Sequence, residues 1–159
     1  MNHVRKTLLL LLLLGMVLLA PGSPALAKGY ESVGVRHAAV HVREAKQQLQ
    51  EARRVLTATK TYEHLYGINV ARWVWLADDV GWPYPEWPTL MMVVDRESGG
   101  SPKAQNPSGA AGLLQLMPGW YNGTYYGNMP DFDPHIPRLN LKYGLWGWKV
   151  DGWIPWAVL

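Results

Sequence analysis

Helical periodicity dominates this sequence and limits the folds it can form. Across residues 35–56 apolar side chains recur every three or four positions, which places them on one face of a helix. A second short helix is predicted over residues 70–80. A third begins near 86–88, where proline is tolerated in a first turn, and ends at Gly99. The sequence shows no internal repeat and no strand pattern longer than a few residues. It therefore predicts a mainly α fold and argues against all-β and α/β folds.

The first 27 residues have the pattern of an export signal. Residues 1–6 are short and basic, residues 8–20 are apolar, and residues 25–27 read Ala-Leu-Ala, a pattern that signal peptidase accepts. The apolar stretch is about 13 residues, shorter than the ~20 needed to cross a bilayer. We expect a signal peptide over 1–27, with an uncleaved anchor as the alternative. The mature chain is then secreted to the periplasm, the cell wall or the medium, with no membrane association after cleavage.

Charge and composition exclude several functions. The chain has 15 Lys and Arg residues and 12 acidic residues. Two of the cations lie in the predicted signal, so the rest of the chain is nearly neutral. That balance argues against nucleic-acid binding. The chain has no cysteine, which excludes disulfides, thiol catalysis and Cys-based zinc sites. His37 and His41 are four residues apart, but no third ligand is evident, so we expect no metal and no cofactor.

The predicted helix over residues 35–56 allows two interpretations. Its stripe is rich in alanine and extends over about three heptads, and charged residues fill the other faces. In one interpretation the helix packs against its own domain. In the other it mediates association with a second copy or with another partner. The sequence alone leaves both open.

Glu97 is the first candidate catalytic residue. It lies in the last turn of an apolar helix, where the partial negative charge of the helix end disfavours a carboxylate. Burial among Met and Val side chains would disfavour ionisation further. Both effects raise the pKa, as a general acid requires. The alternative is an ordinary solvated glutamate at a helix end.

Three motifs around Glu97 resemble the catalytic signature of the soluble lytic transglycosylase (SLT-like) family, in the lysozyme-like superfamily. The family's Glu-Ser pair appears as Glu97-Ser98. Its Gly-Leu-Met-Gln motif, followed by Met-Pro, appears fifteen residues later as residues 112–118, and its Asn-Leu-x-x-Gly motif as residues 140–144. Leu114 takes the place of the family's Met. The family's late Ala-Tyr-Asn motif is missing, and Trp156 and Tyr143 are candidates for the place of its Tyr.

The resemblance implies a lysozyme-like helical domain over residues 67–159, preceded by a helical segment over 28–66. It implies that peptidoglycan glycan strands are the substrate. Glu97 would protonate the β-1,4 bond between N-acetylmuramic acid (MurNAc) and N-acetylglucosamine (GlcNAc). It would then act as base on the muramoyl C6 hydroxyl, which closes a 1,6-anhydro ring. Water is not the nucleophile, so no second carboxylate is required.

Six further residues are predicted at the substrate site. Ser98 would form a hydrogen bond near the site or hold the turn, and Gln115 would donate to substrate oxygens. Leu114 would line the floor, beside Gly112, which would let sugar approach the backbone. Asn140 would either bond the site or cap its helix. The remaining two, Tyr121 and Tyr125, are candidates to stack on sugar faces.

Two other functions stay open at this stage. If Asp95, Asp131 or Asp133 lies across the cleft from Glu97, water could be activated, and the enzyme would be a hydrolytic muramidase like goose-type lysozyme. Alternatively, the domain could bind glycan without cutting it, while helix 35–56 recruits a partner in the cell envelope.

Overall fold

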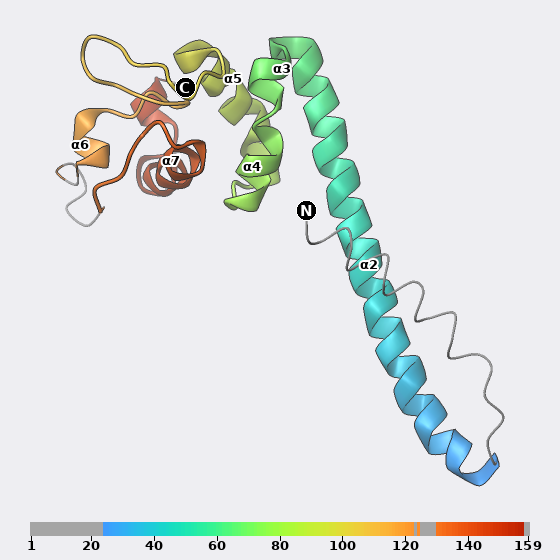
Figure 1. Ribbon diagram of the computed structural model, residues 1–159. Helices are drawn as coiled ribbons and strands as arrows, with labels where there is room; N and C mark the ends of the chain where they lie inside the picture. The colour runs from blue at the N-terminus through green and yellow to red at the C-terminus, as the bar shows by residue number, and fades with distance from the viewer. Residues whose placement is uncertain (1–23, 123, 125–129, 158–159) are drawn as a thin grey trace. The chain divides into compact units, whose positions relative to one another are not determined.

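The computed structural model describes residues 24–122, 124 and 130–157, with the side chains of residues 24–33 left aside, and its architecture is helical (Figure 1). Over these residues no strand forms, and the extended pairing consists of two isolated bridges, Gln105 with Ala111 and Ala111 with Leu116. The predicted mainly α fold is confirmed. Most of the predicted signal peptide lies outside the described residues, so it stays a prediction. Within the described part, no helix is long and apolar enough to cross a membrane.

The chain divides into two units, residues 1–48 and 49–159. Helix α2, Pro24–Tyr66, contains the predicted helix 35–56. In residues 34–48 the apolar side chains Val35 and Val42 are exposed. The domain limits predicted at 28–66 and 67–159 stay predictions.

In the second unit, α2 packs through a different face from the predicted stripe. Ala58 and Tyr62 are buried in the hydrophobic core, whereas Leu49 and Leu56 of the predicted stripe are more than half exposed. The packing face is thus built on a buried tyrosine, which brings more apolar area than alanine.

Helix α5, Trp87–Ser98, is central to the core of the second unit. It contacts α3, Ile68–Ala71, and α4, Val74–Asp79, into which the predicted helix 70–80 is divided. A 3₁₀ turn, η2 (Tyr84–Glu86), precedes it. Its side chains Trp87, Leu90, Met91, Val93 and Val94 are all buried.

Both ends of α5 agree with the sequence prediction. Pro88 occupies its first turn, and Gly99 ends it in a left-handed conformation with φ of 57°. This conformation costs glycine little. Glu97 therefore lies in the last turn of a helix with an apolar, buried face, as predicted.

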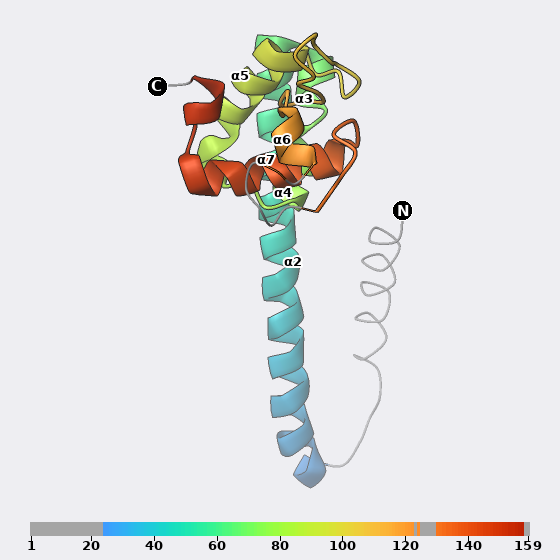
Figure 2. The same ribbon diagram turned by 90° about the vertical axis from the view of Figure 1, so that its left-hand side faces the viewer.

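The remaining elements complete the second unit. They are α6, Pro118–Tyr121, α7, Pro137–Asp151, and a 3₁₀ turn, η3, Ile154–Trp156. Figure 2 shows α6 lying over α7. The contact is close at Gly147 of α7, where an added Cβ would come within 2.1 Å of the Trp120 ring. Glycine at this position is what lets the Trp120 ring pack against α7.

Candidate active site

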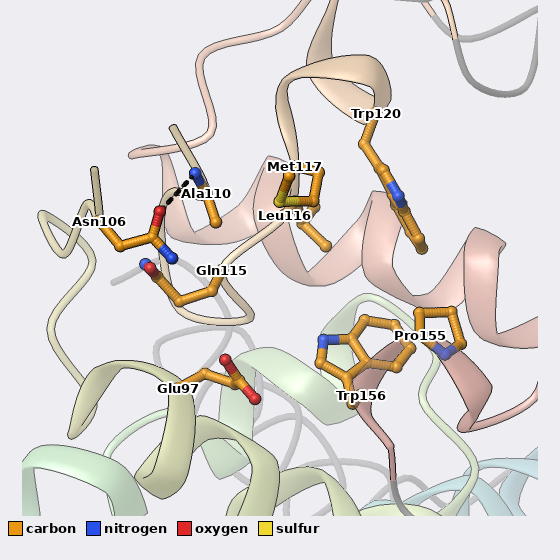
Figure 3. Close-up of a pocket in the computed structure, with 9 residues that line it drawn as sticks. All are labelled: Glu97, Asn106, Ala110, Gln115, Leu116, Met117, Trp120, Pro155 and Trp156. Atoms are coloured by element: carbon orange, nitrogen blue, oxygen red, sulfur yellow. Dashed lines mark hydrogen bonds between the residues drawn. The ribbon is translucent and has the colours of Figure 1, made fainter. Parts of the chain in front are cut away.

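A pocket of about 210 Å³ opens beside the end of α5 (Figure 3). Three parts of the chain line it: the last turn of α5, the segment from Asn106 to Trp120, and η3. Nine described residues form its wall: Glu97, Asn106, Ala110, Gln115, Leu116, Met117, Trp120, Pro155 and Trp156.

Glu97 provides the acidic group of this pocket. Its side chain is half-buried, and burial raises the pKa of the carboxyl, while neighbouring Arg96 lowers it to a smaller extent. The direction is the one that the sequence predicts. A raised pKa lets the carboxyl keep its proton to higher pH, which favours action as a general acid.

Among the described residues of the pocket wall, Glu97 is the one carboxyl group. Asp95 and Asp131 are exposed and do not line the pocket. Asp133 accepts hydrogen bonds from the backbone N–H of His135 at 2.9 Å and from its ring at 3.1 Å. These bonds lower the pKa of Asp133. The internal residues outside the description, 123 and 125–129, include no acid.

Ser98 holds the turn that follows α5. Its hydroxyl lies 2.9 Å from the carbonyl oxygens of both Val94 and Leu113, to which it can donate, and it accepts the Gly100 N–H at 3.2 Å. The contact with Leu113 connects the first motif with the second. Of its two predicted roles, these contacts favour the structural one.

Asn140 is fully buried and does not reach the pocket. Its Oδ1 accepts the Leu114 N–H at 2.9 Å, and its Nδ2 donates to the carbonyl oxygens of Ala111 at 3.1 Å and Pro134 at 2.9 Å. The predicted substrate contact finds no support here and stays a prediction. The capping alternative is wrong, because the N-cap of α7 is Ile136 and has no side-chain cap bond.

Gly112 and Leu114 also serve packing rather than substrate contact. A Cβ on Gly112, whose φ is 80°, would lie 2.1 Å from the Pro134 carbonyl oxygen and 2.2 Å from Asn140 Nδ2. The close approach at this glycine is thus with Asn140. Leu114 is fully buried against Gly144, and Leu116 lines the pocket in its place.

Gln115 lines the pocket, and its side-chain nitrogen is already bonded to the backbone. Its Nε2 donates to the carbonyl oxygens of Ala104 and Gly112, both at 3.0 Å. With both amide hydrogens used, Oε1 is the atom left for a ligand. These bonds leave the nitrogen no hydrogen for the predicted donation to substrate, so a contact of Gln115 with substrate would be made through Oε1. The backbone of Gln115 is left-handed, with φ of 47°.

Residues 83–147 match the family model of the transglycosylase SLT domain. The chain carries an SLT-like domain. No curated protein and no solved structure matches the chain. At the level of the family, the SLT domain supports a lytic transglycosylase-type function that acts on peptidoglycan.

Of the two tyrosines predicted at the substrate site, Tyr121 is the one that the structure describes. The Tyr121 hydroxyl donates to the Gly109 carbonyl oxygen at 2.7 Å, and the ring packs edge-on against Phe132. Tyr121 is not among the residues that line the pocket. Tyr125 lies outside the described residues, so its contact stays a prediction.

Of the two candidates for the place of the family's late Tyr, Trp156 lines the pocket and Tyr143 does not. Tyr143 stacks on Phe132 with ring centroids 4.3 Å apart. Pro155 and Trp156 fall outside the matched residues 83–147.

Several lining residues were not predicted as site residues. One of them, Asn106, had a usable signal: its Oδ1 accepts the N–H groups of Ser108 and Ala110, the turn that an Asn-Pro-Ser sequence favours. Met117 belongs to the second motif, residues 112–118, and Trp120 follows that motif by two residues.

Proposed function

We propose that the protein is a secreted peptidoglycan lytic transglycosylase that cleaves the β-1,4 bond between MurNAc and GlcNAc and forms 1,6-anhydro-MurNAc. The observation that carries this proposal is the single carboxyl group in the described pocket wall, Glu97, whose pKa is raised by burial. The SLT match supports the choice of peptidoglycan as substrate.

One carboxyl group suffices for this reaction. Protonated Glu97 gives its proton to the glycosidic oxygen as the bond to the muramoyl C1 breaks and positive charge develops there. The resulting Glu97 carboxylate then takes the proton of the muramoyl C6 hydroxyl, whose oxygen bonds to C1. Glu97 ends protonated, the GlcNAc side leaves with its hydroxyl, and no water is consumed.

The other pocket residues fit roles around this step. Gln115 Oε1 can accept a hydrogen bond from a sugar hydroxyl or acetamido N–H, because its nitrogen is held by two backbone carbonyl oxygens. The apolar walls from Leu116, Met117 and Trp156 disfavour water near C1. Excluding water favours attack by the C6 hydroxyl of the same sugar.

The proposal is tested by glycan release from purified peptidoglycan. Wild-type protein is expected to release soluble fragments, and Glu97→Gln is expected to fold but release none. Asp95→Asn is the matched control, because Asp95 lies on the same helix, is exposed and does not line the pocket. Release by folded Glu97→Gln, or none by wild type, would reject the assignment.

Secretion is a separate part of the proposal and rests on residues 1–27. Fusing these residues to a reporter that works only outside the cytoplasm tests it. Reporter activity is expected, and it should disappear when charged residues interrupt the leucine run. A silent wild-type fusion would remove secretion from the proposal and leave the enzyme assignment in place.

A further inference from the structure

The turn η3 supplies one wall of the pocket through Pro155 and Trp156. Trp156 is a large ring with only 6% of its surface exposed. Its indole N–H donates to the Leu114 carbonyl oxygen at 2.9 Å, which ties η3 to the second motif. Figure 3 shows the Glu97 carboxyl pointing toward this indole.

Neighbouring tryptophans fix the Trp156 ring in one orientation. Its centroid lies 5.7 Å from that of Trp120 and 5.6 Å from that of Trp153, and both contacts are edge-on. Trp153 is itself anchored, since it stacks on Trp82 at 5.4 Å and donates to Glu86 Oε2 at 2.8 Å. Aromatic contacts of this kind add stability beyond that of buried area.

Few charged groups lie near Glu97, so burial by the pocket wall has the larger effect on ionisation of its carboxyl. Arg96, on the same helix, favours ionisation of Glu97. From the segment 106–120 and from η3, the described lining residues bring no charged or titratable side chain. Burial is therefore what opposes ionisation, and Trp156 is a large apolar side chain on the side toward which the carboxyl points.

We propose that Trp156 is a positioning residue for Glu97, whose ring closes the pocket over the carboxyl and keeps water away from it. The kinetic part of this inference rests on the proposed function, whereas the effect on Glu97 itself does not. Trp156 lies outside the segment that matches the SLT family model, so the match does not assign it a role.

The direct test is a ¹³C NMR titration of the Glu97 side-chain carboxyl in the full chain without substrate. In Trp156→Ala, water reaches the carboxyl, so the midpoint is expected at lower pH than in wild type. Trp156→Phe keeps an apolar ring but loses the bond to Leu114, and its midpoint should stay close to wild type. Trp75→Ala, an exposed tryptophan on α4, is the matched control.

Trp156→Leu keeps the test decisive if Trp156→Ala does not fold, which near-ultraviolet circular dichroism would reveal. Leucine is apolar but smaller than tryptophan. The midpoint of the Glu97 titration in Trp156→Leu is therefore also expected at lower pH than in wild type. A wild-type midpoint in folded Trp156→Ala, or in Trp156→Leu if the alanine variant is unfolded, overturns the proposal.

Kinetics separate this inference from the proposed function. If wild type cleaves glycan, the alkaline limb of kcat/KM should move to lower pH in Trp156→Ala. Above that limb the rate should fall about tenfold for each pH unit of displacement. An unmoved limb overturns the kinetic part. If wild type does not cleave glycan, the proposed function fails, and the NMR titration still decides the role of Trp156.

Discussion

The side-chain amide of Asn140 holds the backbone of Leu114, with Oδ1 accepting the Leu114 N–H at 2.9 Å. Its Nδ2 donates to the carbonyl oxygens of Ala111 and Pro134. Because Gln115 follows Leu114 directly, the third motif fixes the position of a pocket residue without touching the pocket. Hydrogen bonds from Ser98 to Leu113 and from Leu114 to Asn140 join the three motifs into one unit, in which Asn140 supports the segment next to the proposed acid Glu97.

Asn140→Asp is expected to destabilise the protein at neutral pH by about 3 kcal/mol or more, because a buried carboxylate would face two carbonyl oxygens. Burial raises the pKa of the introduced carboxyl in the folded state. Stability is then lost as pH rises through that folded pKa and recovers on acidification. Urea unfolding at neutral and mildly acidic pH measures this.

The matched control for Asn140→Asp is Asn69→Asp, since Asn69 is exposed. It makes the same change of charge outside the core. A loss of stability in Asn140→Asp that is small, or equal at both pH values, would contradict the role given to Asn140.

Gly147→Ala is expected to destabilise the fold by about 1–3 kcal/mol, because the added methyl overlaps the Trp120 ring. In an open helix the same change would stabilise by about 1 kcal/mol. The sign of the change in the free energy of unfolding therefore shows whether the methyl meets the Trp120 ring. Glycan cleavage should fall as well, since Trp120 lines the pocket. Urea unfolding and a cleavage assay measure both effects.

A smaller ring should relieve that overlap. In the double variant Gly147→Ala with Trp120→Phe, the combined loss of stability should be less than the sum of the single losses. Gly34→Ala, where nothing lies within 4 Å, serves as the helix control. Strict additivity in the double variant would count against the contact.

Gln115→Gly is expected to separate stability from activity. Glycine relieves a left-handed backbone that costs other residues about 1–2 kcal/mol, while two hydrogen bonds are lost. The free energy of unfolding should change by about 1 kcal/mol or less, since each such bond is worth about that amount. Glycan cleavage should be lost, because the pocket loses its acceptor. Calorimetry with a cleavage assay checks both, and full activity would show that Oε1 is dispensable.

Glu97→Gln is expected to be more stable than wild type at neutral pH. Burial raises the folded-state pKa of Glu97, so the wild type loses stability as pH rises through that pKa, and glutamine does not. The difference should close on acidification, where Glu97 is protonated. Thermal unfolding across pH measures it, with exposed Glu63→Gln as control. A wild type more stable than Glu97→Gln at neutral pH would contradict the burial of this carboxyl.

Local patterns predicted much of this molecule. The limits of α5 followed from Pro88 and Gly99, and the position of Glu97 followed from those limits. The motif spacing then indicated Gln115, which lines the pocket together with Glu97. Such features depend on neighbours within a few turns of the chain, which a sequence displays directly.

Contacts across longer separations could not be predicted. Asn140 reaches Leu114 over 26 residues, and the alternatives of substrate contact and helix cap were equally compatible with its position. The donor end of Gln115 is used by Ala104 and Gly112, which no spacing rule reveals. The packing face of α2 was likewise decided by Tyr62 and the core it meets.

Association through residues 35–56 stays a prediction. Leu49 and Leu56 are exposed, and so are Val35 and Val42. Sedimentation of wild type and of Leu49→Gln with Leu56→Gln tests self-association. If wild type and the double variant both sediment with the mass of a monomer, a second copy is excluded as the partner.

The most direct test of the central claim is the mass of the soluble fragments that wild-type protein releases from purified peptidoglycan. If Glu97 works alone, each muramoyl end carries the anhydro ring and is lighter than the hydrolytic product by one water. Hydrated ends throughout would show that water attacks C1, and would contradict the single-carboxyl mechanism.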